Sequence, residues 1–366
     1  MVTRRGVSAG TGGTMNLDDL ERFRKLDAGG MLAHIDGLPD QLQEAWSLGQ
    51  RLPLPEWDGI RQVIVSGMGG SAIGADLLRA YAEPLSRVPI TVWRNYDLPA
   101  WAAGPETLLV ASSHSGNTEE TISAFEAGRQ RGLRLLAVTR GGELGSRAEK
   151  TGVPTWHFEH AGQPRAAVGF SFGLLLAVLA RSGLLPDPAA ELRNAVGAMK
   201  AQQKSLRAES PVVTNLAKRM AGQLMDRWPL IIAGGLLAPV ARRWRTQIAE
   251  VGKALAQFEE LPEADHNMVA GVMEPKTSIE RVMALFLTAG TDHPRLQLRA
   301  RVTRNVMMVE GFNTDLLEAQ GDTRLAQQWT SLLLGDYISF FLAMTYGVDP
   351  TPVAAIESLK AQLKEG

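Results

Sequence analysis

One segment of the chain gathers residue types that can hold an anion: Ser112-Ser113-His114-Ser115-Gly116-Asn117-Thr118-Glu119-Glu120-Thr121. It follows the apolar run 108–111, which is typical of a buried strand, and it precedes apolar residues spaced as on one face of a helix. A turn from a strand into a helix presents free backbone N–H groups and side-chain hydroxyls at the positive end of the helix dipole. The segment therefore predicts a phosphate site.

The spacing within this segment also limits the ligand. It lacks the lysine of a Walker loop and the three-glycine spacing of a dinucleotide fingerprint, so we expect a phosphorylated small molecule. A serine-rich turn that only caps a helix is the alternative interpretation. The three hydroxyl residues ahead of Gly116, together with Thr118 after it, favour the phosphate site.

The composition excludes several classes of protein. Of the 366 residues, 45% are hydrophobic, which is enough for two buried cores. The formal net charge of -1 gives no sign of a nucleic-acid partner or of attraction to an acidic membrane surface. The chain has no cysteine, so disulfides, thiolate nucleophiles and cysteine-based metal sites are excluded.

The N-terminal segment and the apolar runs indicate whether the chain is exported or inserted into a membrane. Residues 1–14 are rich in Gly, Ser and Thr, and Arg4-Arg5 is not followed by the apolar stretch of an export signal, so we expect a flexible tail. The apolar run 170–180 is too short to span a bilayer and is expected to form a buried helix. We therefore expect a cytoplasmic protein without a membrane segment.

Strand and helix signals alternate along the chain, as in a parallel sheet that helices cover on both faces. The first half contains expected strands at 62–65, 90–93, 108–111, 135–138 and 155–158, with expected helices at 72–80 and 166–181. After a polar helix at 189–207 the pattern restarts, with expected strands at 230–233, 281–287 and 306–309, a loop at 257–271, and helices at 239–255, 294–304, 324–346 and 352–364. These signals predict an α/β fold of two doubly wound, flavodoxin-like parallel-sheet subdomains covered by helices, 15–190 and 191–366.

The segment His157-Phe158-Glu159-His160 is the nearest candidate for a metal site. In a strand, His157 and Glu159 face one side and His160 faces the other, so the three side chains do not converge on one ion. We expect a strand end there and no metal.

Two further stretches carry a resemblance to a known family. Gly67-Met68-Gly69-Gly70-Ser71-Ala72-Ile73-Gly74, taken with the Ser115 to Thr121 segment, resembles the sugar isomerase (SIS) domain. More narrowly, Leu261-Pro262-Glu263-Ala264-Asp265-His266-Asn267 and the stretch 335–360 resemble the bifunctional phosphoglucose/phosphomannose isomerase family. The resemblance implies two SIS-type subdomains, the first of them binding phosphate. It also implies a metal-independent, cofactor-free isomerase that interconverts glucose 6-phosphate or mannose 6-phosphate with fructose 6-phosphate through an enediolate.

The resemblance implies a role for each matching residue. The sugar phosphate would be held by Gly70, Ser71, Ser113, Ser115 and Thr118. Arg165 would face the developing enediolate, and Glu250 would be the base that moves a proton between C1 and C2. His266, supplied by the partner subunit of a homodimer, would open the sugar ring, and Lys360 would assist near the ring oxygen and the phosphate.

The chain departs from the family pattern beside three of these groups. Glu250 lies between Ala249 and Val251, where asparagine is usual, Met268 stands where the family has a glutamate, and His114 replaces a tyrosine. These changes leave the proposed base and ring-opening group in place. They leave open which epimer is preferred.

Other interpretations remain open for the residues and for the protein. Glu250 alone is compatible with a solvated helix residue paired with Lys253 or Arg245, and Arg165 with a surface charge at a helix start. The role of Lys360 depends wholly on its spacing from Asp349-Pro350-Thr351-Pro352. The protein as a whole is compatible with an isomerase of another sugar phosphate. A non-catalytic phosphosugar-binding sensor is also possible, although the sequence has no helix-turn-helix or basic face to accompany one.

Overall fold

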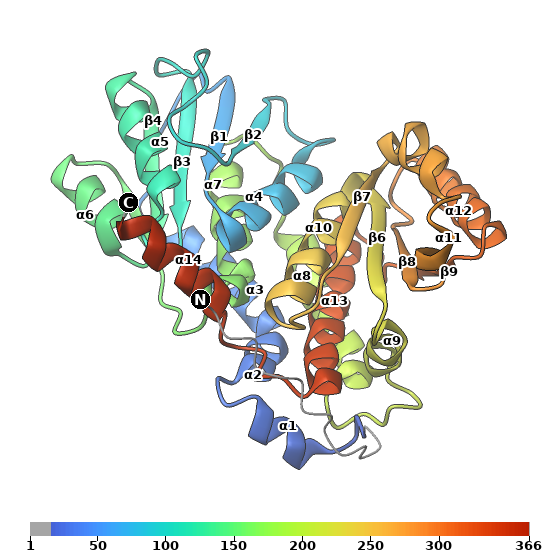
Figure 1. Cartoon of the computed structure of the whole chain (residues 1–366). Helices are drawn as coiled ribbons and strands as arrows, with labels where there is room; N and C mark the ends of the chain where they lie inside the picture. Colours follow the sequence, from blue (N-terminus) through green and yellow to red (C-terminus); the bar gives the residue numbers. More distant parts are fainter. Residues whose placement is uncertain (1–15, 366) are drawn as a thin grey trace.

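The structure is a computed structural model that describes residues 16–365. The expected tail at 1–14 lies outside the described residues. Two parallel sheets stand side by side in the molecule, one from each half of the chain (Figure 1). The prediction of an α/β fold with two doubly wound units is therefore confirmed, while the boundary at 190/191 stays a prediction.

The first sheet has five parallel strands in the order β2-β1-β3-β4-β5. Its strands are β1 Gln62–Ser66, β2 Ile90–Trp93, β3 Thr107–Ser113, β4 Arg134–Thr139 and β5 Thr155–His157. The central strand β3 is buried along its whole length, as expected of a strand with helices on both faces. From β1 the chain adds β2 on one side, and from β3 it adds β4 and β5 on the other side, so the strand order switches between β1 and β3. Ligands bind at such a switch point in doubly wound folds.

Helices cover both faces of this sheet. The helices of this half of the chain are α1 Leu20–Leu26, α2 Met31–Asp36, α3 Leu38–Arg51, α4 Gly69–Ala82, α5 Glu119–Gln130, α6 Gly142–Lys150 and α7 Val168–Arg181, with the short 3-10 helix η1 Pro164–Ala166. Helix α4 packs against β1, β2 and β3, whereas α5 packs against β3 and β4, and α6 against β4 and β5. The almost wholly apolar α7 packs against α3 and α4, which explains why it carries no polar face.

The second sheet repeats the order of the first four strands, as β7-β6-β8-β9. Its strands are β6 Trp228–Gly234, β7 Gln257–Leu261, β8 Val282–Thr288 and β9 Asn313–Glu318. The helices of this half are α8 Ala189–Leu206, α9 Leu216–Leu224, α10 Ala238–Glu250, α11 Lys276–Ile279, α12 Pro294–Val309, α13 Arg324–Tyr346 and α14 Ala354–Glu365. Short 3-10 helices lie at η2 Gly235–Leu237, η3 Glu263–His266 and η4 Met268–Gly271.

Two predicted elements of the second half were wrong. Residues 306–309 continue α12, because Val306 is exposed and Met307 is buried on a helical rather than an alternating pattern, and the strand is β9 instead. The expected loop at 257–271 contains β7, a partly exposed edge strand whose polar sequence hid it.

One hydrophobic core runs through both halves of the molecule. Helix α13 is buried almost from end to end and packs against α8, α9 and α10. Side chains of α7 and α13 belong to the same core, so the two sheets are held together rather than linked loosely. Within residues 16–365, no helix has the length and apolar character needed to cross a membrane.

A side chain of the protein itself occupies the space in front of the turn after β6. Leu236 N–H donates to Asp292 Oδ1 at 3.1 Å, and a Cβ added at Gly235 would lie 2.7 Å from the same oxygen. This turn corresponds in the sheet order to the one after β1. A side-chain carboxylate therefore occupies the space in front of it.

The contact between α4 and α7 predicts a steric effect of a single methyl group. In Gly74→Ala the added Cβ would lie 2.6 Å from Ser171 Cβ and 2.8 Å from the Ser171 carbonyl carbon, so we expect the free energy of unfolding to fall by about 1–3 kcal/mol. The control is Gly197→Ala in α8, where the Cβ meets nothing within 4 Å and a gain of up to about 1 kcal/mol is expected. Denaturant unfolding measures both, and equal values for the two variants would contradict the packing argument.

Candidate active site

The predicted anion turn links β3 to α5. Ser113 Oγ and Thr118 Oγ1 lie 2.9 Å apart, and Gly116 N–H donates to Ser113 Oγ at 3.1 Å. Gly116 has a φ of 70°, and a Cβ there would lie 1.8 Å from Gly141 O, so only glycine fits. Thr118 directly precedes α5, whose first N–H groups have no partner within the helix. The turn has the form expected of an anion site.

A second helix begins beside this turn. Gly69 and Gly70 open α4, and Ser71 is buried in its first turn. A Cβ added at Gly70 would lie 2.4 Å from Pro164 O, so the start of α4 lies directly against the segment that carries Arg165. This close approach requires glycine at position 70.

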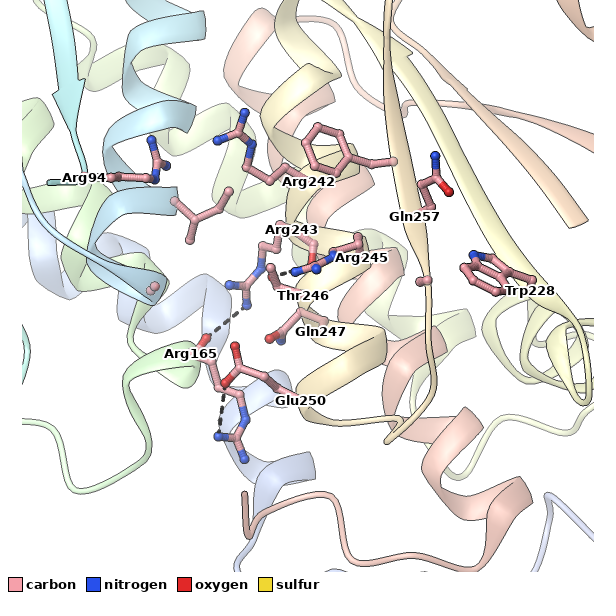
Figure 2. A pocket seen from close by; sticks show the side chains of 15 residues that line it. Arg94, Arg165, Trp228, Arg242, Arg243, Arg245, Thr246, Gln247, Glu250 and Gln257 are labelled. Carbon is pink, nitrogen blue, oxygen red and sulfur yellow. Dashed lines mark hydrogen bonds and ion pairs between the residues drawn. The ribbon is translucent and has the colours of Figure 1, made fainter. Parts of the chain in front are cut away.

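A cavity of about 610 Å³ lies between α4, α10 and β7 (Figure 2). The charged residues lining it are Arg94, Arg165, Arg242, Arg243, Arg245 and Glu250. Gly69, Gly70 and Phe258 are also in its wall. Asp76 pairs with Arg94 and Arg242, and Asp336 pairs with Arg243, so the five arginines exceed the carboxylates around them and the cavity is suited to an anionic ligand.

The carboxylate of Glu250 faces a buried arginine across this cavity. Glu250 ends α10, and its Oε2 lies 3.6 Å from Nη1 of Arg165 (Figure 2), whose side chain is 4% exposed. Lys253 Nζ instead donates to the backbone oxygen of Glu250 at 2.5 Å and to Pro352 O at 2.6 Å. The alternative in which the Glu250 carboxylate pairs with Lys253 therefore does not describe this structure.

Arg165 is held by backbone oxygens from the far end of the chain. Its Nη2 donates to Pro350 O at 3.1 Å and also to Thr351 O. Burial lowers the pKa of the Arg165 guanidinium, and the Glu250 carboxylate acts against that shift. Because an arginine does not lose its proton in proteins, the group remains a buried cation.

A buried ion pair supports this arrangement from behind. Arg243 Nε and Nη2 donate to the two carboxylate oxygens of Asp336 on α13, at 3.1 and 2.6 Å, and Nη2 also donates to Arg165 O at 3.1 Å. Gln247 Nε2 donates to Asp336 Oδ1 at 3.1 Å. Burial raises the pKa of the Asp336 carboxyl, and the Arg243 guanidinium opposes that rise. Sequence reasoning missed this pair, although Arg243, Gln247 and Glu250 at i, i+4 and i+7 mark one helix face.

Two buried polar atoms of residues lining the cavity have no hydrogen-bond partner within the described part of the chain, Arg165 Nε and Gln247 Oε1. Buried polar groups in folded proteins are nearly always hydrogen-bonded.

The structure brings together only some of the predicted site residues. Gly70, Arg165 and Glu250 line the cavity, whereas Ser113, Ser115 and Thr118 form the neighbouring turn and are not in its wall. Lys360 lies on α14, where every described side chain from Ala354 onward is exposed, and its role is still a prediction.

His266 lies away from the cavity of its own chain. It is exposed on η3, beyond the carboxyl end of β7, whereas the cavity is lined by Phe258 near the start of that strand. At about 3.3 Å per residue, the part of β7 that follows Phe258 extends about 10 Å away from the cavity before η3 begins. The neighbouring Asp265 accepts from Arg299 at 2.7 Å and from Thr303 at 2.6 Å, which fixes η3 on α12.

Among residues 16–365, no group of three or more His, Asp or Glu side chains has the geometry to hold a metal ion. β5 ends at His157, so residues 158–160 lie beyond the strand rather than alternating along it. His157 Nε2 lies 3.3 Å from Glu149 Oε1, and His160 turns instead toward His114.

The paired sheets, the serine-threonine turn at the switch point and the basic cavity together define a protein of the SIS class. Residues 213–363 match the family described as bacterial phospho-glucose isomerase C-terminal SIS domain. A bifunctional phosphoglucose/phosphomannose isomerase from Caldicellulosiruptor bescii is 35% identical over 339 residues, covering 92% of this chain and 99% of the relative. One from Aquifex aeolicus is 33% identical, covering 85% and 95%. The chain belongs to the bifunctional phosphoglucose/phosphomannose isomerase family.

Solved structures agree with the fold. A glucose-6-phosphate isomerase like protein from Thermus thermophilus superposes with a TM-score of 0.63 at 21% identity. The match covers 92% of this chain and 98% of that one. The identity is low, so this likeness speaks for the architecture alone.

The buried pair behind the cavity predicts a large loss of stability. In Arg243→Met, Asp336 is left as a buried carboxylate without its cation, and we expect the free energy of unfolding to fall by about 3–5 kcal/mol. Arg245→Met, on the same helix but exposed, is the matched control, with an expected change within about 0.5 kcal/mol. Denaturant unfolding of both variants is the measurement, and a loss below about 1 kcal/mol for Arg243→Met would refute the assigned role.

Proposed function

We propose that this protein is an aldose–ketose isomerase that interconverts glucose 6-phosphate and mannose 6-phosphate with fructose 6-phosphate, without a metal ion. The observation that carries the proposal is the Arg165–Glu250 pair inside a basic cavity that begins at the amino end of α4. Membership of the family, with relatives named for both activities, supports the same substrates. A cytoplasmic location is part of this proposal.

The proposed reaction first needs an anchor for the phosphate. The N–H groups at the starts of α4 and α5, with the hydroxyls of Ser71, Ser113, Ser115 and Thr118, are suited to hold a dianion. Gly70 contributes its backbone where the start of α4 lies against the segment that carries Arg165. Holding the phosphate there leaves the sugar chain to extend toward Arg165.

The second need is proton transfer between neighbouring carbons. Glu250 takes the proton from C2 of the open-chain aldose and returns it to C1, while negative charge gathers on the two oxygens of the enediolate. Arg165 stabilises that charge, because a cation that is itself buried interacts strongly with an oxyanion beside it. Both groups are side chains of the protein, so the chemistry requires no metal.

Ring opening is assigned to His266 of a second subunit. The position of His266 beyond β7, remote from the cavity of its own chain, supports delivery in trans within a homodimer. Imidazole can give and take a proton near neutral pH, as ring opening requires. Lys360 is proposed to assist at the ring oxygen, and its exposure on α14 leaves the amine available.

Glu250→Gln tests the assigned base. The amide keeps the size of the side chain but cannot accept the carbon-bound proton, so we expect kcat to fall by about 10²–10⁴-fold with little change in KM. A coupled assay with fructose 6-phosphate measures this, and Glu260→Gln, exposed on β7, is the matched control that should keep its activity. Activity that survives Glu250→Gln would show that the base is another residue. Wild-type protein that binds fructose 6-phosphate without turnover would instead indicate a sensor.

Subunit mixing tests delivery of His266 in trans. Glu250→Gln and His266→Ala are each expected to be inactive, but their heterodimer has one site with both native residues. An equal mixture after subunit exchange should recover about a quarter of the wild-type activity, because half the dimers are mixed and each has one working site. Full activity of isolated monomers, or no recovery in a mixture shown to contain heterodimers, would refute the proposal.

A further inference from the structure

Three histidines that the proposed reaction does not use meet beside the anion turn. His114 Nε2 lies 3.1 Å from His160 Nδ1, and the rings of His160 and His34 have centroids 5.1 Å apart. His114 is 6% exposed, and its ring packs edge-on against Phe158. Phe158 in turn stacks on Phe170, with centroids 5.1 Å apart.

The contact joins two parts of the candidate site. His114 lies between Ser113 and Ser115 in the anion turn, and His160 lies five residues before Arg165. The opposite side of the turn is fixed by backbone contacts, in which Leu144 N–H donates to Gly116 O at 2.8 Å. The imidazole contact is thus a direct side-chain link from the turn to the segment that carries Arg165.

The segment after β5 is shaped to allow this contact. A Cβ added at Gly162 would lie 2.6 Å from His34 Nε2 and 2.8 Å from His160 Cε1, so a side chain there would push the two imidazole rings from their present positions. His160 Nε2 is buried and has no hydrogen-bond partner in the described part of the chain. The His160 ring therefore meets its polar partner through Nδ1, at His114.

The contact also restricts protonation. At 3.1 Å a single N–H lies between the rings, so one imidazole donates and the other must accept with an unprotonated nitrogen. Burial lowers the pKa of both His114 and His160 to about 4. The charged and titratable groups that face the pair are Arg140, which follows β4, and His34 on α2, and both oppose a further proton.

We propose that His114 and His160 are positioning residues, a neutral imidazole pair that holds the anion turn in register with Arg165 and releases it when the pair takes up a proton. This inference rests on the proposed function, because it gives the pair a task in placing the phosphate relative to Glu250. The pair touches neither the phosphate nor the reacting carbons. It acts through the position of Ser113 and Ser115.

Sulfate binding tests the pair without relying on turnover, because sulfate keeps its charge between pH 4 and 7. His160→Leu removes the contact and should weaken sulfate binding and raise the KM for fructose 6-phosphate, each by at least about tenfold. His160→Gln, whose amide can both donate and accept, should recover most of the affinity. His157→Gln, in the same segment but exposed, is the matched control and should leave the affinity unchanged.

The pH dependence of sulfate affinity distinguishes two roles of the histidine pair: positioning the anion turn when neutral, or attracting the anion when protonated. Wild-type affinity for sulfate should fall about two- to threefold from pH 6 to pH 4, because a pair with a pKa of about 4 is about half protonated at the lower pH. The double variant His114→Gln/His160→Gln should show a flatter profile. Affinity that rises on acidification would mean that protonated histidine attracts the anion, and the proposal would be wrong. Equal sulfate affinity in His160→Leu and wild type would also overturn it. Normal sulfate results in a wild-type protein without isomerase activity would overturn the proposed function alone.

Stability gives a second measurement if His160→Leu does not fold. Histidines in the unfolded chain titrate near pH 6.5, whereas these two titrate with a pKa of about 4 when folded. Between these values the unfolded state binds more protons, so the free energy of unfolding should fall as the pH falls from about 6.5 to about 4. The fall should be smaller in the double glutamine variant, and identical slopes would contradict a buried neutral pair.

Discussion

The buried contact between Arg243 and Asp336 determines how the rest of the site is arranged. It joins α10 to α13, the helix at the centre of the shared core, and it passes through Arg243 to the backbone of Arg165. Removing two charges from water costs desolvation free energy that can cancel their attraction unless their hydrogen bonds are complete. Here Gln247 donates one more hydrogen bond to Asp336. The position of Arg165 opposite Glu250 thus depends on an interaction that neither residue makes.

Much of the architecture could be predicted from the sequence because its buried elements are strongly patterned. The continuous apolar strands β1, β3 and β4 and the apolar helix α7 have few alternatives, and α13 spans the residues expected of it. The failures fall where burial is partial. β7 and β9 are polar strands at the edges of the second sheet, and edge strands do not need an apolar face to be stable.

In the candidate site, the turns could be predicted from the sequence, but the contacts between distant residues could not. Glycine-rich and serine-rich turns carry a local signal, so Gly70 and the Ser113 turn could be found from neighbouring residues alone. The partners of Arg165 could not, because Pro350 and Arg243 lie far away in sequence and meet it only in the folded chain. The same holds for His114 and His160, which the fold brings together from two loops 46 residues apart.

The four strands of the second sheet have the same order as the first four of the first sheet, yet the corresponding turns after β1 and β6 differ in the space and charge in front of them. The turn after β1 opens toward a basic hollow, while the turn after β6 already has the carboxylate of Asp292 against its backbone. An anionic ligand at the turn after β6 would be repelled by this carboxylate. The repeated architecture is in this way one-sided in this chain: the turn after β1 faces the basic cavity, whereas its counterpart after β6 is closed by a carboxylate.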